Sequence, residues 1–83
     1  MNPNDNREIK IRVIYEDNQP YIVTVSPVTT VHELKEKLYD LTKLPIDEQK
    51  LIFRGKVLEN NNDMISCKIE DDCTIHLIHY DVC

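Results

Sequence analysis

Alternation of apolar and charged side chains in residues 9–15 is the feature that most constrains the fold of this chain. The segment reads Ile-Lys-Ile-Arg-Val-Ile-Tyr, and a period of two residues is typical of a strand with one buried face. A turn rich in Asp, Asn and Pro follows over residues 16–20, and Tyr21–Val25 is a second β-prone run. The two runs predict a β-hairpin, with Pro20 and Pro27 bounding its second strand.

A single amphipathic helix is predicted after this hairpin. Thr30-Val31-His32-Glu33 matches a capping box, in which the threonine hydroxyl accepts from the glutamate amide and the glutamate side chain reaches back. The helix is expected to end near Thr42, because Pro45 pushes the residue before it towards extended geometry. Four apolar residues at helical spacing form the expected buried face. They are Val31, Leu34, Leu38 and Leu41.

A second hairpin is predicted around Gly55, the only glycine in the chain. The β-prone segments 51–53 and 57–58 flank the dipeptide Arg54-Gly55, and glycine takes positive φ in a tight turn without steric cost.

The end of the chain predicts one more strand. Residues 73–80 alternate again, and Met64, Ile65 and Ile69 suggest a short helical turn packed under the sheet. The order is therefore two strands, a helix and two strands, with a short helical turn before the last strand. It predicts an α+β fold in which a mixed sheet covers one helix.

The middle of the chain resembles ubiquitin. Residues 45–59, Pro-Ile-Asp-Glu-Gln-Lys-Leu-Ile-Phe-Arg-Gly-Lys-Val-Leu-Glu, carry the resemblance, and residues 74–78 are similar to the last ubiquitin strand. Ubiquitin-like sequences can be laid on residues 9–80 without a gap. The resemblance implies the β-grasp (ubiquitin-like) architecture over that range. The polar residues 1–8 are expected to form a disordered tail, and residues 81–83 to continue into a longer protein.

A binding patch is predicted on the outer face of this sheet. If Leu51 and Phe53 point into the core, Ile52 points outward, and the same parity turns Ile78 outward on the last strand. In ubiquitin-like folds the matching residues lie side by side, and Glu16 stands where ubiquitin has a third apolar patch residue. The alternative is that these isoleucines are scattered surface residues. The resemblance implies a protein-binding patch of Lys50, Ile52, Gly55, Lys56, His76 and Ile78.

Composition argues against several other partners. The 83 residues carry a net charge of -5, which disfavours nucleic acid or an anionic membrane as the main partner. No apolar run reaches the length of a membrane span, and no signal peptide is visible. Three cysteines without a dense framework favour free thiols in a reducing compartment, cytoplasmic or nuclear.

Residue types alone would allow a metal site or a catalytic cysteine near the end of the chain. Cys67, Cys73, His76 and His79 are of zinc-ligand type, but a spacing of three along a strand turns Cys73 and His76 to opposite faces. The same argument separates the only local cysteine–histidine pair that could act as nucleophile and base. No cofactor, metal site or catalytic activity is expected.

The resemblance implies a non-conjugated ubiquitin-like module, as in ubiquilins or BAG-family chaperone cofactors. Such a module, expected to be a monomer, would dock to proteasome subunits, ubiquitin-interacting helices or ubiquitin-associated domains in ubiquitin-dependent degradation or quality control. Two alternatives stay open. One is a protein modifier whose Gly-Gly tail is absent from this chain, although Tyr80-Asp81-Val82-Cys83 contains no glycine. The other is a regulatory module of a deubiquitinating enzyme.

Overall fold

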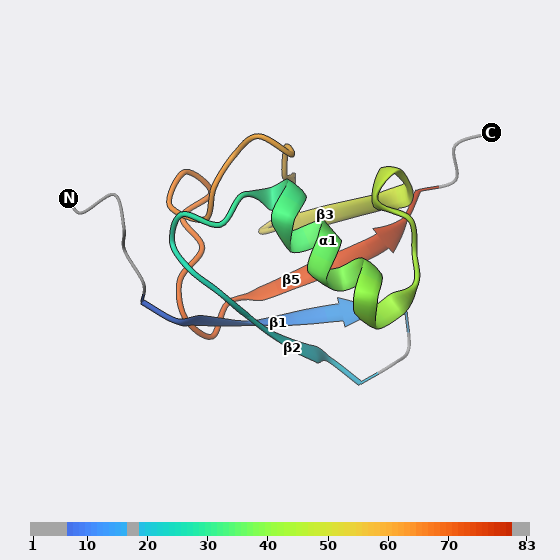
Figure 1. Ribbon diagram of the computed structural model, residues 1–83, viewed down its shortest axis with the longest axis horizontal. Helices are drawn as coiled ribbons and strands as arrows, with labels where there is room; N and C mark the ends of the chain where they lie inside the picture. The colour runs from blue at the N-terminus through green and yellow to red at the C-terminus, as the bar shows by residue number, and fades with distance from the viewer. Residues whose placement is uncertain (1–6, 17–18, 81–83) are drawn as a thin grey trace.

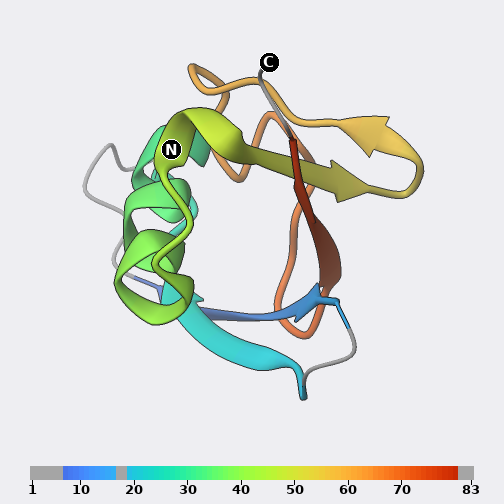
Figure 2. The ribbon, with the colours of Figure 1, turned by 90° about the vertical axis from the view of Figure 1, so that its right-hand side faces the viewer.

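A five-stranded mixed sheet curves around one helix in the computed structural model, which describes residues 7–16 and 19–80 (Figures 1 and 2). The predicted tail falls mostly, and residues 81–83 wholly, outside the described residues. The strands are β1 (Ile9–Tyr15), β2 (Tyr21–Val25), β3 (Gln49–Phe53), β4 (Lys56–Val57) and β5 (Thr74–His79). The helix α1 spans Val31–Thr42, and a 3-10 helix η1 spans Ile46–Glu48.

The strand order β2-β1-β5-β3-β4 brings the first and last strands together in the middle of the sheet. β1 runs parallel to β5 and antiparallel to β2, while β3 is antiparallel to both β5 and β4. The alternation in residues 9–15 has its expected result, because Ile9, Ile11 and Val13 are buried and the residues between them are exposed. The predicted mixed sheet over one helix is confirmed.

The capping box at the start of α1 is also confirmed. The Thr30 amide donates to Glu33 Oε1 over 2.8 Å, and the Glu33 amide donates to Thr30 Oγ1 over 3.1 Å. At the other end the helix stops at Thr42, and Lys43 takes the left-handed conformation with φ 64°. The Lys43 amide donates to the Tyr39 carbonyl over 2.7 Å, so a lysine fills a position that usually favours glycine.

One residue of the expected helix face was assigned wrongly. Val31, Leu34 and Leu38 are fully buried, but Leu41 is 49% exposed. With about 3.6 residues per turn, Leu41 falls at the margin of the buried stripe. On the opposite margin Lys35 is only 7% exposed. Regular spacing therefore identified the centre of the stripe correctly and misjudged its two edges.

The short helical turn expected over residues 64–69 was also wrong. Residues 64–68 form consecutive turns, in which Met64 and Ile69 are buried but Ile65 is exposed. Lys68 has φ 60°, and a left-handed residue cannot continue a right-handed helix. The Ile69 amide returns to the Met64 carbonyl over 2.9 Å and closes the segment as a loop.

Small differences remain at the strand ends. β4 covers residues 56–57 where segment 57–58 was expected, and β5 is one residue shorter at each end than the predicted 73–80. The 3-10 helix η1 was not anticipated. Gln49 follows it, and its buried side-chain amide donates to the Lys35 and Leu44 carbonyls, both over 2.9 Å. These bonds join the start of β3 to α1 and to the segment that follows α1.

Candidate functional site

The candidate site begins at the turn between β3 and β4. Arg54 has φ 55° and Gly55 has φ 79°, and two successive positive values are typical of the tight turn whose twist matches a hairpin. A Cβ added at Gly55 would meet nothing within 4 Å. Glycine is therefore required here by backbone conformation and not by space. The turn presents Gly55 and Lys56, both exposed, at the end of the sheet.

The register of β3 and β5 brings the other four predicted residues together. Lys50 lies opposite Ile78, and Ile52 lies opposite His76. Their neighbours along the strands, Leu51, Phe53, Ile75 and Leu77, are all buried, so these four side chains face outward. Ile78 is 45% exposed. All six predicted patch residues thus lie on the outer face of β3 and β5 or in the adjoining hairpin.

Two apolar residues that sequence reasoning missed extend this face. Ile14 lies opposite His76 in the β1–β5 pair, and Val57 lies opposite Ile52 in the β3–β4 pair. Val57 is 50% exposed. A signal for Ile14 was available, because it is apolar at an outward position of the first alternating segment. Together the four residues form an outer-face row, Ile14–His76–Ile52–Val57, that crosses four strands.

Tyr80 adds an aromatic ring at the far end of the patch. Its amide donates to the Glu48 carbonyl over 2.7 Å, and Lys50 Nζ lies 4.9 Å from the centre of its ring. A cation over an aromatic face is a favourable contact. His79 Nε2 and Glu48 Oε1 are 2.8 Å apart beside it. This end of the sheet therefore already has internal partners for several of its polar groups.

The third apolar position of the ubiquitin patch is filled by Glu16 at the same end. Tyr15 lies opposite Leu77 at the end of the β1–β5 pair, and Glu16 follows it in the turn, with φ 55°. Its side chain is exposed. Burial, followed by the Glu16 side chain, raises the pKa of the Tyr15 hydroxyl, which therefore stays neutral. The patch has an anionic edge here.

The cysteines and histidines are spread over the fold. Within residues 7–16 and 19–80, no group of three or more His, Cys, Asp and Glu side chains could hold a metal ion. Cys67 and Cys73 are free thiols, and Cys83 lies outside the described residues. Burial and the nearby Asp63 raise the pKa of the Cys67 thiol. In the described chain, no helix has the length and apolar content needed to cross a membrane.

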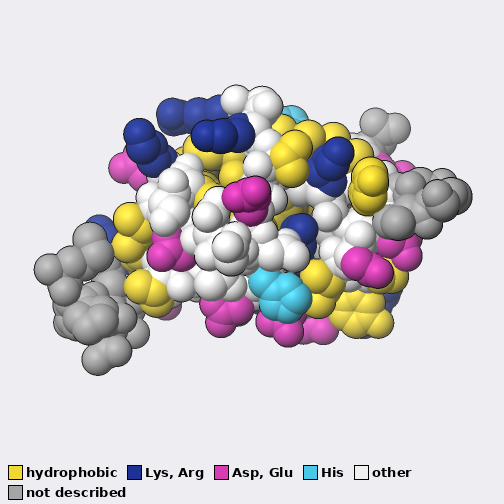
Figure 3. All heavy atoms as spheres, turned by 90° about the horizontal axis from the view of Figure 1, so that it is seen from above, with side chains coloured by type: hydrophobic (Ala, Val, Ile, Leu, Met, Phe, Trp, Pro, Cys, Tyr) yellow, Lys and Arg dark blue, Asp and Glu magenta, His cyan; other side chains and the backbone are white. Residues whose placement is uncertain are grey.

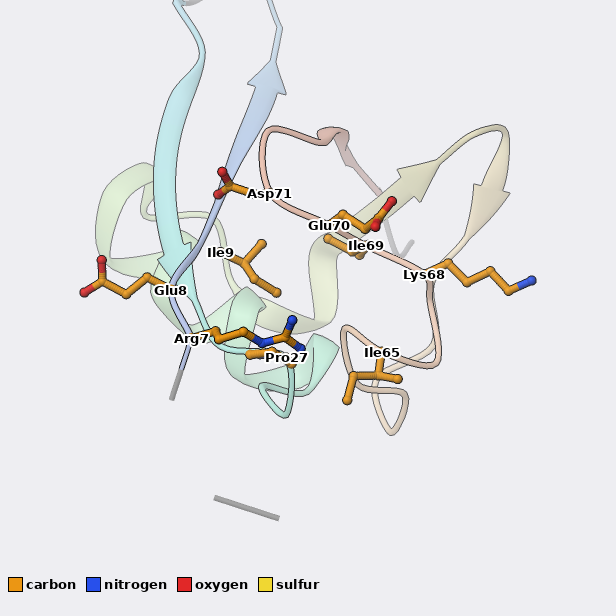
Figure 4. A pocket seen from close by; sticks show the side chains of 9 residues that line it. All are labelled: Arg7, Glu8, Ile9, Pro27, Ile65, Lys68, Ile69, Glu70 and Asp71. Carbon is orange, nitrogen blue, oxygen red and sulfur yellow. The ribbon is translucent and has the colours of Figure 1, made fainter. Parts of the chain in front are cut away.

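A hollow of about 960 Å³ lies away from this patch, where β1 begins (Figure 4). Ile9, Pro27, Ile65 and Ile69 give it apolar walls. Its charged lining is mixed, with three carboxylates and two cations. The charged residues are Arg7, Glu8, Lys68, Glu70 and Asp71.

Comparison with known proteins agrees with this geometry. Residues 9–79 match the family model described as "Ubiquitin family". The chain therefore belongs to the ubiquitin family. It is 34% identical over 56 residues to the ubiquitin domain-containing protein DSK2 of Saccharomyces cerevisiae, covering 68% of this chain and 15% of that protein. It is 26% identical over 70 residues to DSK2a of Arabidopsis thaliana, a match that covers 84% of this chain and 13% of that protein.

A solved structure confirms the β-grasp prediction. The chain matches the UBL domain of Plasmodium falciparum Dsk2 with a TM-score of 0.83 and 25% identity, covering 88% of this chain and 99% of that one. The chain spans only about 13 to 15% of the length of the two DSK2 relatives. The likeness therefore concerns the ubiquitin-like part of those proteins.

Proposed function

We propose that this chain is a non-conjugated ubiquitin-like docking module that binds ubiquitin receptors through its outer face and performs no chemistry itself. Its partners would be proteasome subunits, ubiquitin-interacting helices or ubiquitin-associated domains, reached as a monomer in the cytoplasm or nucleus. The role would be that of an adaptor in ubiquitin-dependent degradation or quality control. Relatives with this domain include ubiquitin domain-containing DSK2 proteins and a ubiquilin, which supports the proposal.

The observation that carries the proposal is the outer-face row with a cationic rim, in which Val57 is exposed and Ile14 and Ile52 are half-buried. Ile52 and Val57 lie side by side on the outer face, with Lys50 and Lys56 next to them. Contiguous apolar surface bordered by charge suits a partner helix that buries its own apolar face while its acidic residues meet the lysines. So few residues imply a small interface, at the low end of specific ones, where binding is weak and reversible.

The test is an NMR titration of the isotopically labelled domain with a ubiquitin-interacting helical peptide. Saturable shifts are expected at the amides of Ile52, Gly55, His76 and Ile78. Ile52→Ala should weaken binding about tenfold, because it removes apolar surface from the centre of the contact. Leu41→Ala on α1 is the matched control and should leave the affinity unchanged. Full affinity in Ile52→Ala, or shifts confined to another face, would refute the proposal.

A further inference from the structure

A second hollow, of about 520 Å³, lies between the β3–β4 hairpin and residues 59–68. We name it the hairpin groove. Phe53 and Leu58 contribute buried apolar side chains to its lining. Arg54, Lys56 and Lys68 line it with three cations, against one lining carboxylate, Glu59. In a chain of net charge -5, this is a local reversal of sign.

The three groove cations are not engaged by carboxylates of the protein. None of them forms an ion pair with any residue in the described ranges. On the face seen in Figure 3, several Lys and Arg side chains lie together at the upper left, and others lie singly across the rest of the face. In Figure 4 the Lys68 side chain points away from the hollow at the start of β1. The charges are therefore available to an incoming anion.

Two of these cationic residues are held in place by contacts within the protein. The Arg54 guanidinium carbon lies 5.1 Å from the centre of the Phe53 ring, and such stacking holds a guanidinium in one orientation. Lys68 is held in the left-handed conformation, with its amide donating to the Ile65 carbonyl over 3.0 Å. Stacking of the Arg54 guanidinium, and the fixed backbone of Lys68, reduce the conformational entropy lost on binding at those two points.

The hairpin groove is continuous with the candidate docking patch. Lys56 belongs to both, and Val57 lines the groove while ending the outer-face row. The opposite end of the patch carries Glu16 and the Glu48–His79 pair. A partner that crosses the patch thus meets cations at the hairpin end and carboxylates at the other. Lys50 also lies towards that other end, with its ammonium over the Tyr80 ring, so the acidic part of the partner is attracted more strongly to the hairpin end, where three cations gather.

We propose that the hairpin groove binds an acidic peptide segment that continues directly from a partner helix seated on the outer-face row. This inference rests on the docking function proposed above and adds a second subsite that gives the bound partner one orientation. The ligand is a short run of Asp or Glu side chains. Nucleic acid is a poor alternative, because the acidic remainder of the molecule repels an extended polyanion.

Four peptides built on one ubiquitin-interacting helix test the inference. Two of them carry four added glutamates, one beyond the amino end and one beyond the carboxyl end of the helix, and the other two carry four glutamines at the same places. Each peptide is titrated into the labelled domain at low ionic strength. For one of the two ends, the glutamate peptide should bind about fivefold more tightly than its glutamine counterpart. The amides of Arg54, Ser66 and Lys68 should shift with that peptide only.

Charge variants assign the effect to the groove. Arg54→Gln combined with Lys68→Gln should abolish the fivefold difference and leave binding of the glutamine peptides within about twofold. Lys10→Gln combined with Lys37→Gln removes the same net charge elsewhere and should preserve the difference. Amide spectra of each variant verify that it is folded.

The outcomes separate the two proposals. Equal affinities with shifts at Ile52 and Ile78 would leave docking intact and overturn the groove. The groove is also overturned if the difference survives loss of Arg54 and Lys68, or disappears equally in the Lys10 and Lys37 control. If none of the four peptides shifts the amides of Ile52 and Ile78, the docking function fails and the groove inference fails with it.

Discussion

At the scale of single residues, Lys35 is the least expected feature of the core. It lies on α1 at the margin of the buried stripe formed by Val31, Leu34 and Leu38, and it is itself only 7% exposed. No described residue forms an ion pair with it. Burial lowers the pKa of its ammonium below the ordinary value. The aliphatic stem packs well, but the charge loses hydration and gains no carboxylate in exchange.

Lys35→Met should therefore raise the free energy of unfolding by about 1 kcal/mol at neutral pH. Methionine keeps the unbranched stem and removes the buried charge. Urea denaturation measures the change, and Lys37→Met on the exposed side of the same helix should alter stability by less than about 0.5 kcal/mol. A less stable Lys35→Met domain would show that the ammonium makes a favourable contact.

The same substitution has a defined pH dependence. The pKa of Lys35 in the folded protein lies below its ordinary value of 10.5. At a pH between the folded pKa and 10.5, the unfolded chain therefore binds more protons than the folded protein. The stability contribution of this residue therefore rises with pH across that window. The advantage of Lys35→Met should shrink as pH increases towards 10.5, whereas a constant difference would exclude burial of the charge as its cause.

At the scale of elements, the N-terminus of α1 depends on a reciprocal cap. Thr30 and Glu33 satisfy one another's backbone amides, which would otherwise lack partners at the first turn. The hydrogen bond from the Thr30 amide, followed by that from its side chain, lowers the pKa of the Glu33 carboxyl. The charged carboxylate thus stabilises the fold at neutral pH.

Thr30→Ala should reduce the free energy of unfolding by about 1 kcal/mol, because the Glu33 amide loses its acceptor. Chemical denaturation at pH 7 gives the value, and Thr24→Ala, at an exposed position of β2, serves as the comparison. The pKa of Glu33 is lower in the folded protein than its ordinary value. Its contribution to the free energy of unfolding is therefore present above the ordinary pKa and is lost as the pH falls through the pKa of the folded protein. Glu33→Gln should remove this acid-dependent part.

Local signals predicted these elements well where the determinants lie close together in sequence. The strands at residues 9–15 and 21–25 and the helix ending at Thr42 follow from period, capping and proline position. They failed over residues 64–69, where Lys68 adopts positive φ. The chain has one glycine, Gly55, so the residue type that usually marks such a backbone was missing. Lys43 also takes positive φ, but there Pro45 marked the end of α1 in place of a glycine.

At the scale of the whole molecule, the proposed docking face is a product of strand order. The outer-face row takes one residue from each of four strands, and Ile14 is 62 residues from His76, its cross-strand neighbour. His76 was predicted as a patch residue, whereas Ile14 was only an apolar residue at an outward position of its own strand. Only the parallel pairing of the first and last strands places the isoleucine beside the patch.

Ile14→Ser should consequently weaken binding of the ubiquitin-interacting helix about fivefold, because the row loses apolar surface at its β1 end. Isothermal titration calorimetry of the purified domain provides the affinity. Val28→Ser, at an exposed apolar position before α1, is the matched control and should bind as the unaltered domain does. Unchanged affinity in Ile14→Ser would restrict the contact to β3, β4 and β5.

Local sequence was sufficient to predict the α+β class, the helix cap, the Arg54-Gly55 turn and the outward parity of Ile52 and Ile78. Each of these depends on backbone preferences or side-chain alternation within a few residues. Tertiary structure alone decided that Ile14 and Val57 join them, that Lys35 is buried, and that Lys68 lies beside the hairpin. These features depend on which strands pair and in what register, and register is set by burying one face of every strand in a common core.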